Sequence, residues 1–453
     1  MDRRPPLKER KFVSEEVERV IEELEQKLDN EELFSLFRNC YPNTLDTTIE
    51  YFEDSERFPS SFVITGDIKA MWLRDSCNQL FTYSALLKRD TRLQKLFLGL
   101  IRTQAIVVQK HPYSNAFRNP MVELIEPLEE NVWANDDRVM PPTPPLVWEA
   151  KWELDSLAAF LKLSRVYHDE TGDVSYFITR EWLSAIKMVL RVIRLQQRGT
   201  TEATNDEDYT FSRITRSCTE TLYSEGLTAP AMRCGLIKSA FRPSDDATTF
   251  PFLIPSNAMM EVELRNTVRL LSSLTKEKNE STGECEELRG ECLRLADELR
   301  EAIYRHVTEM WQIFAYEVDG HGSHHLMDDA NVPSLLSLPY IGFISREDPL
   351  YQRTRRYILS QHNPYHFRGQ FAQGVGSPHT GANRVRPRGR DGEIEDIIDI
   401  LKRCTAGTGL MHESFHVDDP REFTRSWFSW ANGLFGELIL HHHASSSWGI
   451  QVE

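Results

Sequence analysis

The sequence predicts an all-α fold whose β elements are short and lie in loops. Apolar residues recur at three- and four-residue spacings along much of the chain, which is typical of helices that bury one face. Strand-like runs are few and short, the clearest being Ser61–Thr65 and Ile313–Val318. Because strands do not alternate regularly with helices, a parallel doubly wound sheet is not expected. The segments with helical spacing are 13–37, 78–88, 92–109, 152–167, 175–198, 256–276, 285–305, 348–360, 392–403 and 426–441.

Two of these segments show the helical pattern most clearly. Segment 13–37 is charged, and its apolar stripe consists of Val17, Val20, Ile21, Leu24 and Leu28. In segment 285–305, charged residues four positions apart support a helix by pairing along its surface. The apolar stripe of that segment is Leu288, Leu293, Leu295, Leu299 and Ile303.

Composition excludes several classes of protein. Of 453 residues, 40% are hydrophobic, which is enough for a packed core and excludes an intrinsically disordered chain. The net charge is −16, which would repel a nucleic acid. No run approaches the roughly 18 apolar residues of a membrane span, and the charged start MDRRPPLKERKF lacks the apolar core of a signal peptide. We therefore expect a cytoplasmic protein that binds neither nucleic acid nor membrane.

The chain is expected to form one domain. Helical toroids and barrels reach this length as single units, and the insertion-like segments 126–147 and 382–391 are too short to fold separately. Residues 1–12 and 442–453 are predicted to be flexible tails. The seven cysteines are scattered without a CxxC pair, which indicates reduced thiols.

Two motifs carry carboxylates in settings suited to acid–base chemistry. Asp245 and Asp246 are adjacent, after Arg242 and a proline, and two carboxylates in one environment disfavour joint ionisation. The plainer interpretation of this motif is a helix cap. Glu413 follows a glycine-rich turn and could act as a general base. Its plainer interpretation is a salt bridge to Arg425.

A third motif combines an indole with charged groups, as sugar recognition requires. Asp67, Arg74 and Asp75 flank Trp72, and carboxylates accept hydrogen bonds from hydroxyls while an aromatic face covers the apolar face of a pyranose. The competing interpretation is a structural Arg74–Asp75 ion pair beside a core tryptophan.

A metal site has weaker support. His324, His325, Asp328 and Asp329 have suitable side chains, but no HExxH motif or tetrahedral spacing accompanies them. Clustered His and Asp in a turn usually form hydrogen bonds. We therefore expect no metal and no cofactor.

Taken together, these motifs resemble glycoside hydrolase family 125, whose members are metal-independent exo-α-1,6-mannosidases that invert the anomeric centre and fold as an (α/α)6 barrel. The resemblance runs from about residue 40 to residue 440. It is carried by CYPNTLDTT, TGDIKAMWLRDS, VWEAKWELDSL, FRPSDDA with LIPSN, LMDDANVPSLLSLPY, GSPHT, MHESFHVDDP and FTRSWFSWANGLFGELI.

The resemblance implies roles for residues already singled out. Its general acid is an aspartate in the RPSDD block, hence Asp245 or Asp246, and its general base is Glu413. Asp67, Arg74 and Asp75 would hold the terminal mannose of an oligosaccharide or N-glycan. The further candidates for the pocket are Trp72, Trp148, Asp155, Arg242, His379, His412 and Arg425.

The chain departs from the family pattern after Gly376–Thr380. An apolar, tryptophan-containing helix is expected there, but the chain continues through TGANRVRPRGRDG, so one helix near residues 381–392 is predicted to be missing. Two alternative functions remain at this stage. One is a glycan-binding homologue with impaired turnover, and the other is a metal-dependent hydrolase using the His324–Asp329 cluster.

Overall fold

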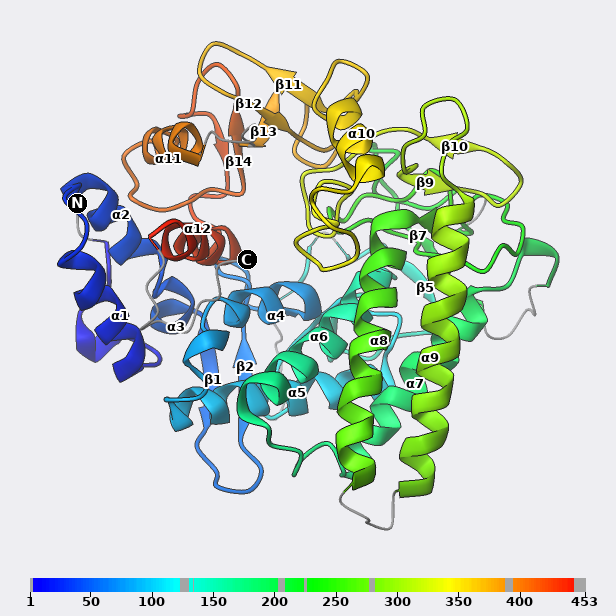
Figure 1. Cartoon of the computed structure of the whole chain (residues 1–453), viewed down its shortest axis with the longest axis horizontal. Coiled ribbons are helices and arrows are strands. Elements are labelled where there is room, and N and C mark those ends of the chain that lie inside the picture. The colour runs from blue at the N-terminus through cyan, green and yellow to red at the C-terminus, as the bar shows by residue number, and fades with distance from the viewer. Residues whose placement is uncertain are drawn as a thin grey trace.

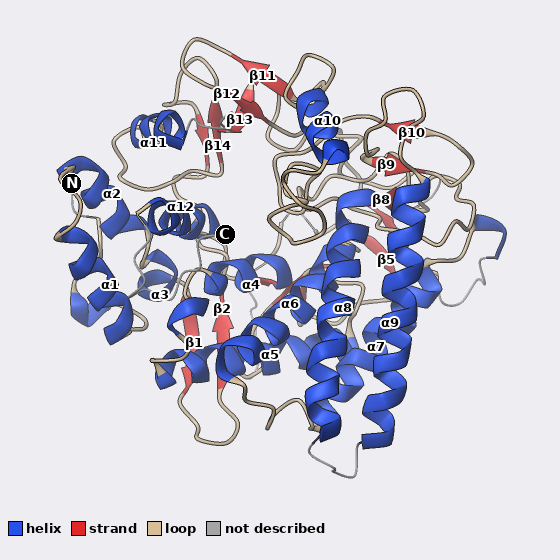
Figure 2. Cartoon of the chain, in the orientation of Figure 1, coloured by secondary structure: helices blue, strands red, loops and turns tan. Residues whose placement is uncertain are grey.

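The computed structural model describes residues 3–122, 130–132, 134–202, 208–223, 226–276, 282–387 and 394–443. Helices dominate this part of the chain, and the strands are short (Figure 2). The α-helices are α1 (Glu15–Glu25), α2 (Glu31–Cys40), α3 (Asn43–Thr47), α4 (Leu73–Phe81), α5 (Thr91–Lys110), α6 (Leu154–Thr171), α7 (Arg180–Gln196), α8 (Ile254–Lys276), α9 (Thr282–Arg305), α10 (Pro349–Ile358), α11 (Ile394–Arg403) and α12 (Ser429–His442). Short 3₁₀ helices lie at Leu7–Glu9, Ser84–Leu86 and Thr200–Glu202.

The strands form small antiparallel sheets. They are β1 (Ile49–Glu53), β2 (Ser60–Val63), β3 (Met71–Trp72), β4 (Ala116–Phe117), β5 (Arg138–Met140), β6 (Val147–Glu149), β7 (Thr210–Ser212), β8 (Phe252–Leu253), β9 (Glu317–Val318), β10 (His324–His325), β11 (His366–Arg368), β12 (Gln373–Val375), β13 (Arg384–Pro387), β14 (Ser414–His416) and β15 (Phe423–Thr424). The sheet orders are β1-β2, β10-β9-β8, β3-β4-β6, β5-β7 and β11-β12-β13-β14-β15.

The predicted helix-rich fold is confirmed, with one clear difference near the N-terminus. The apolar stripe of segment 13–37 is divided between α1 and α2. The division occurs because the Asn30 side chain accepts a hydrogen bond from the backbone N–H of Leu33 at 2.9 Å and so caps a new helix. Helix α1 begins in the same way, with the Ser14 hydroxyl accepting from the backbone N–H of Val17.

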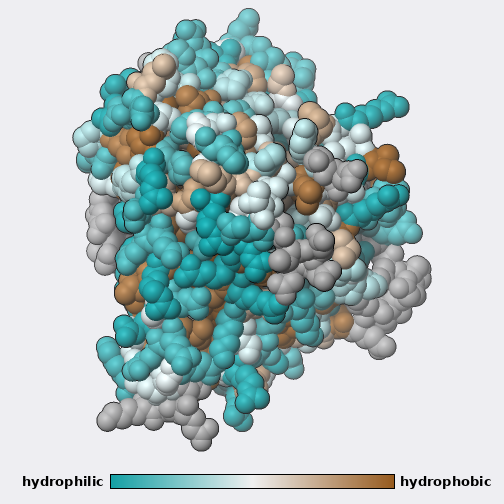
Figure 3. Space-filling model, turned by 90° about the vertical axis from the view of Figure 1, so that its right-hand side faces the viewer, coloured by the Kyte–Doolittle hydropathy of each residue, from teal (hydrophilic) through white to brown (hydrophobic). Residues whose placement is uncertain are grey.

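The helices pack side by side around a continuous core. Helix α6 packs against α4, α5 and α8, and α9 packs against α7 and α8. Helix α12, near the end of the chain, packs against α2, α3 and α4 from its beginning (Figure 1). Figure 3 shows the side on which α9 lies, where hydrophilic residues cover most of the surface. The stripe predicted for α9 is largely buried, with Leu288, Leu295, Leu299 and Ile303 inside, whereas Leu293 is exposed.

The five-stranded sheet is a feature that the sequence did not predict. Its strands are three to four residues long, apart from the two-residue β15, and such lengths are too short to show an alternating apolar pattern. In its centre β13 pairs with β14, with Arg384 opposite His416 and Val385 opposite Phe415. The sheet therefore brings the 384–387 segment against the strand that follows Glu413.

The predicted missing helix falls partly on this sheet. Residues 381–383 form a turn and 384–387 form β13, whereas residues 388–393 lie outside the described residues. Between α10 and α11, the described part of the chain contains strands and loops only. In this structure the segment is therefore used, in part, as a strand.

The expectation of a flexible tail over residues 1–12 does not fit residues 3–12. Arg4 ion-pairs with Asp46 at 2.6 Å and with Glu18, and its side chain is almost fully buried. Phe12 is buried as well. At the other end, residues 444–453 lie outside the described residues. Among the described helices, none combines the length and apolar content needed to cross a membrane.

Candidate active site

Chain segments that lead into α4, α6 and α8 bring polar side chains to one place. Arg74 and Asp75 lie in the first turn of α4, and Asp155 lies in the first turn of α6. Ser256, at the start of α8, donates a hydrogen bond to Asp155 at 3.2 Å. Carboxylates are favoured at helix N-termini because the backbone N–H groups there carry partial positive charge.

Arg74 links two buried carboxylates. Its Nη1 lies 2.7 Å from Glu153 Oε2 and 2.8 Å from Asp155 Oδ2, and the side chains of both acids are fully buried. Burial raises the pKa of each acid, and Arg74 opposes that effect. Because Arg74 pairs with these two acids, the proposed structural ion pair between Arg74 and Asp75 is not formed. Asp75 stays close by, and burial raises its pKa to about 6.

The structure separates the two adjacent aspartates of the RPSDD block. Asp245 has a left-handed backbone conformation, with φ +68°, within a tight turn closed by its N–H and the carbonyl of Arg242 at 2.9 Å. This conformation is uncommon for a residue with a side chain, and it directs the two neighbouring carboxylates to different surroundings.

Asp245 faces a group of polar side chains. Its carboxylate lies 3.5 Å from Asn115 Nδ2, and the same amide nitrogen lies 3.3 Å from the carboxyl of Glu153. Burial raises the pKa of Asp245, but the positive charges of Lys151 and His379 outweigh burial and lower it to about 2. The surroundings thus lower the pKa of Asp245 and raise the pKa of its neighbour Glu153.

Asp246 is fully buried, and its carboxylate accepts hydrogen bonds from the loops around the site. Its Oδ2 accepts hydrogen bonds from the backbone N–H of His379 at 2.8 Å and from the Ser244 hydroxyl at 3.2 Å. Burial raises its pKa to about 6. These contacts fix the position of the His379 loop. The helix-cap interpretation of the RPSDD block is wrong, because no helix begins there.

Glu413 lies immediately before β14, opposite the same histidine. Its carboxylate is 3.4 Å from Arg386 Nη2 and accepts from the Thr424 hydroxyl at 3.4 Å. His379 reaches solvent, but surrounding protein atoms crowd its ring. Burial of its ring lowers the pKa of His379, but the carboxylates of Asp245 and Glu413 outweigh this effect and raise it. Because His379 lies near both carboxylates, Asp245 and Glu413 lie in the same region of the fold, although they are 168 positions apart in the chain.

Asp67 and Arg425 form a pair at the edge of this group. Arg425 Nη2 lies 2.5 Å from Asp67 Oδ1, and the two side chains are 20% and 36% exposed. Their partial exposure leaves them accessible to a ligand. The predicted Glu413–Arg425 salt bridge is not formed at bonding distance, although the charge of Glu413 raises the pKa of Arg425.

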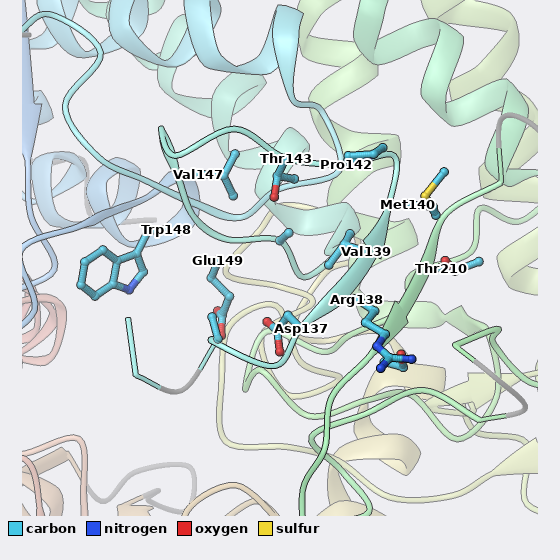
Figure 4. A pocket seen from close by; sticks show the side chains of 13 residues that line it. Asp137, Arg138, Val139, Met140, Pro142, Thr143, Val147, Trp148, Glu149 and Thr210 are labelled. Atoms are coloured by element: carbon cyan, nitrogen blue, oxygen red, sulfur yellow. The ribbon is translucent and has the colours of Figure 1, made fainter. Parts of the chain in front are cut away.

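The aromatic candidates lie beside the charged group. Trp72 is buried, and it clusters with Ala70, Ala116 and the half-buried Trp148. The guanidinium of Arg118 lies over the Trp148 ring, 4.9 Å from its centroid. Trp148 also lines a cavity of about 830 Å³ between β5, β6 and β7. Trp148 lies at one end of this cavity and Met140 and Thr210 lie at the other (Figure 4).

Two predicted site residues have other partners. The guanidinium of Arg242 lies 2.6 Å from the buried carboxylate of Glu317. Both ring nitrogens of His412 lie within 3.2 Å of backbone carbonyls, those of Arg425 and Thr405, and its ring stacks on Phe423 with centroids 3.7 Å apart. These contacts give both side chains a part in holding loops in place, and their role in the pocket stays a prediction.

The alternative metal cluster does not form. Asp328 accepts from the backbone N–H groups of Leu335 and Leu336, whereas His325 contacts Glu317 at 3.3 Å. Within the described residues, no three His, Cys, Asp or Glu side chains gather in a metal-binding arrangement. The backbone turn uses these carboxylates for hydrogen bonds, as the plainer interpretation of the cluster holds.

Several site residues were missed by sequence reasoning. Asn115 Nδ2 contacts Glu149 at 3.1 Å and Glu153 at 3.3 Å, and Lys151 lies 3.5 Å from Glu149. A signal was present, because Glu149, Lys151 and Glu153 alternate along an extended segment, and alternate residues of an extended chain share a face.

Comparison with known proteins identifies the family. Residues 30–440 match the family described as metal-independent alpha-mannosidase (GH125). The chain belongs to the GH125 family. It is therefore a glycoside hydrolase of the alpha-mannosidase type, and the predicted family is confirmed.

Two similar proteins match nearly the whole chain. The chain is 45% identical over 457 aligned positions to the meiotically up-regulated gene 157 protein of Schizosaccharomyces pombe, covering 96% of this chain and 87% of that protein. It is also similar to a solved structure of a metal-independent alpha mannosidase from Streptococcus pneumoniae in a non-productive complex with α-1,6-mannobiose. That similarity has a TM-score of 0.85 and 37% sequence identity, covering 95% of this chain and 98% of the other.

Proposed function

We propose that this chain is an inverting exo-α-1,6-mannosidase that removes terminal, non-reducing mannose from oligosaccharides or N-glycans. The observation that carries the proposal is the meeting of Asp245 and Glu413 around His379. The α-1,6-mannobiose in the similar Streptococcus pneumoniae structure supports the choice of linkage. We further propose that α4, α6, α8 and α12 belong to the inner ring of an (α/α)6 barrel.

In the proposed reaction, Asp245 is the general acid. It protonates the glycosidic oxygen while the bond from that oxygen to the anomeric carbon breaks. Asp245 is preferred to Asp246 because Asp246 is fully buried and already accepts hydrogen bonds from His379 and Ser244. The proton that Asp245 needs must come from a neighbouring group, since the charges around it lower its pKa.

Glu413 is proposed as the general base. It would remove a proton from a water molecule that attacks the anomeric carbon from the opposite face, which inverts the configuration. Inversion requires space for that water, so the two carboxyls should lie roughly 6.5–9.5 Å apart in the complex. The neighbouring Arg386 and Thr424 hold the Glu413 carboxylate in one orientation.

The remaining polar groups are proposed to hold the terminal mannose. Asp67 and Arg425 are partly exposed and can exchange their mutual contact for sugar hydroxyls. Asp75 lies near both Asp245 and Glu413, since each of their charges raises its pKa. The half-buried Trp148 offers a ring face to a pyranose.

The test is hydrolysis of α-1,6-mannobiose followed by proton NMR. Early appearance of the β anomer of mannose supports inversion, and early α-mannose refutes it. Activity on α-1,6-mannobiose but not on α-1,2- or α-1,3-mannobiose supports the linkage. The variant Glu413→Gln should lose turnover by about 10²–10⁴-fold, the usual contribution of a general base. Mannose binding without turnover in the unmodified protein would favour the glycan-binding alternative instead.

A further inference from the structure

The carboxyl pair Glu153–Asp245 has an arrangement suited to holding a single proton. Glu153 is fully buried in the first position before α6, and its carboxyl and that of Asp245 lie around the same Asn115 amide. Asn115 Nδ2 lies within 3.5 Å of both acids. A hydrogen bond between two carboxyl groups requires a proton on one of them, because two carboxylates have only acceptors.

We propose that Glu153 shares one proton with Asp245 and returns it to Asp245 during the reaction, so that the proposed acid has a proton near neutral pH. This inference rests on the proposed role of Asp245. Glu153 acts through Asp245 and is therefore a positioning residue. Two carboxyls in one low-dielectric site titrate as a pair, and the pair keeps its last proton to a higher pH than either acid alone.

The surroundings of each carboxyl suit one half of this exchange. Glu153 accepts from Arg74 at 2.7 Å and from the Ser156 hydroxyl at 3.0 Å, so it can bear a negative charge after giving up its proton. Burial raises the pKa of Glu153, which favours its protonated form in the empty site. Asp245 faces Lys151 and His379, whose charges stabilise it as the anion until substrate arrives.

The proton balance of the proposed step is complete. The glycosidic oxygen takes a proton from Asp245 as its bond to the anomeric carbon breaks, and Asp245 receives the proton of Glu153. The attacking water forms the new bond to that carbon and gives its proton to Glu413. Afterwards Glu413 releases a proton to solvent and the carboxyl pair takes one up, so no proton is gained or lost.

The test compares two substrates with the variant Glu153→Gln. An amide keeps the size and can still accept from Arg74, but it cannot deliver a proton. We expect kcat/KM for α-1,6-mannobiose to fall by about 10²–10⁴-fold. For 2,4-dinitrophenyl α-mannoside, whose phenolate leaves without a proton, we expect a loss below about tenfold. An equal loss for both substrates, or no loss for either, would overturn the proposal.

The pH dependence supplies a second readout. The alkaline limb of kcat/KM for mannobiose should move to lower pH in Glu153→Gln, by about one unit or more. The titratable and charged groups that face the pair are Arg74, Asp75, Lys151, Asp155 and His379. Deprotonation of His379 would lower the rate for both substrates equally. A limb that moves only for mannobiose therefore reports on the carboxyl pair and not on His379. The control Glu263→Gln, a buried carboxylate that pairs with Arg165 and not with Arg74, should leave the limb in place.

Measurements on the unmodified enzyme keep the proposal testable if the variant does not fold. Carboxyl-carbon chemical shifts of enzyme labelled at Asp and Glu should show one buried carboxyl still protonated at pH 7, and full ionisation of every site carboxyl would refute the shared proton. An unmodified enzyme that hydrolyses neither substrate would refute the proposed function. An active enzyme whose Glu153→Gln variant behaves normally would refute only the role of Glu153.

Discussion

Replacement of Arg74 by methionine should destabilise the protein strongly. Arg74 Nη1 contacts Glu153 and Asp155, and the three side chains are at most 3% exposed. Methionine fills similar space, but it leaves two buried acids without their cation. Removing one partner of a buried ion pair costs about 3–5 kcal/mol, because the remaining charge is uncompensated. We therefore expect a loss of about that size in the free energy of unfolding at pH 7.

The loss should depend on pH in a defined direction. The pKa values of Glu153 and Asp155 are raised in the folded protein, so these acids oppose folding when they are ionised. Without Arg74 their pKa values rise further. Below about pH 3, both acids are largely protonated in the folded and unfolded chains. The destabilisation should therefore be small in acid and should grow as the pH rises towards neutral.

Urea unfolding at pH 5 and pH 8, followed by circular dichroism, measures this difference. Arg421→Met is the control, since Arg421 pairs with Asp419 on the surface, where its side chain is 81% exposed. Exposed pairs contribute little to stability, so the control should unfold like the unmodified protein at both pH values. An Arg74→Met loss that is equal at pH 5 and pH 8 would refute the electrostatic explanation.

Two further predictions concern the proposed acid and base. Asp245→Asn should lower turnover of α-1,6-mannobiose by about 10²–10⁴-fold without backbone strain, because asparagine tolerates the left-handed backbone at φ +68°. Asp246→Asn should lower turnover less and change KM more, and the reverse order in steady-state kinetics would make Asp246 the acid. Arg386→Met should lower kcat, because it removes the contact at 3.4 Å that orients Glu413. An unchanged kcat in Arg386→Met would show that Thr424 suffices to hold the base.

The sequence predicts the helices well and the small sheets poorly. Long stripes such as that of α9 repeat enough times to identify a helix, whereas β13 and β14 are too short to show a pattern. The contact between them joins residues far apart in the chain, as Arg384 and His416 illustrate. Local patterns contain no information about such register, so the position of Arg386 next to Glu413 could not be predicted.

The site was partly predictable for a similar reason. Arg74, Asp75 and Asp155 could be singled out because each lies in a motif with mixed aromatic and charged residues, and the structure brings them together. Asp245 and Asp246 could not be told apart, since their orientations depend on one backbone angle. The ion pair of Arg242 with Glu317 could not be predicted, because the two residues lie 75 positions apart in the chain.

The strand that stands in place of an expected helix has a consequence for natural variation. Arg386 on β13 donates to both the carbonyl and the carboxylate of Glu413. Insertions or deletions between Thr380 and Ile394 would shift this guanidinium along the sheet even when every acid of the pocket is preserved. Proteins that differ from this one in that stretch alone should therefore differ in catalytic rate, and a comparison of such length variants would reveal how strongly a remote loop can govern the chemistry.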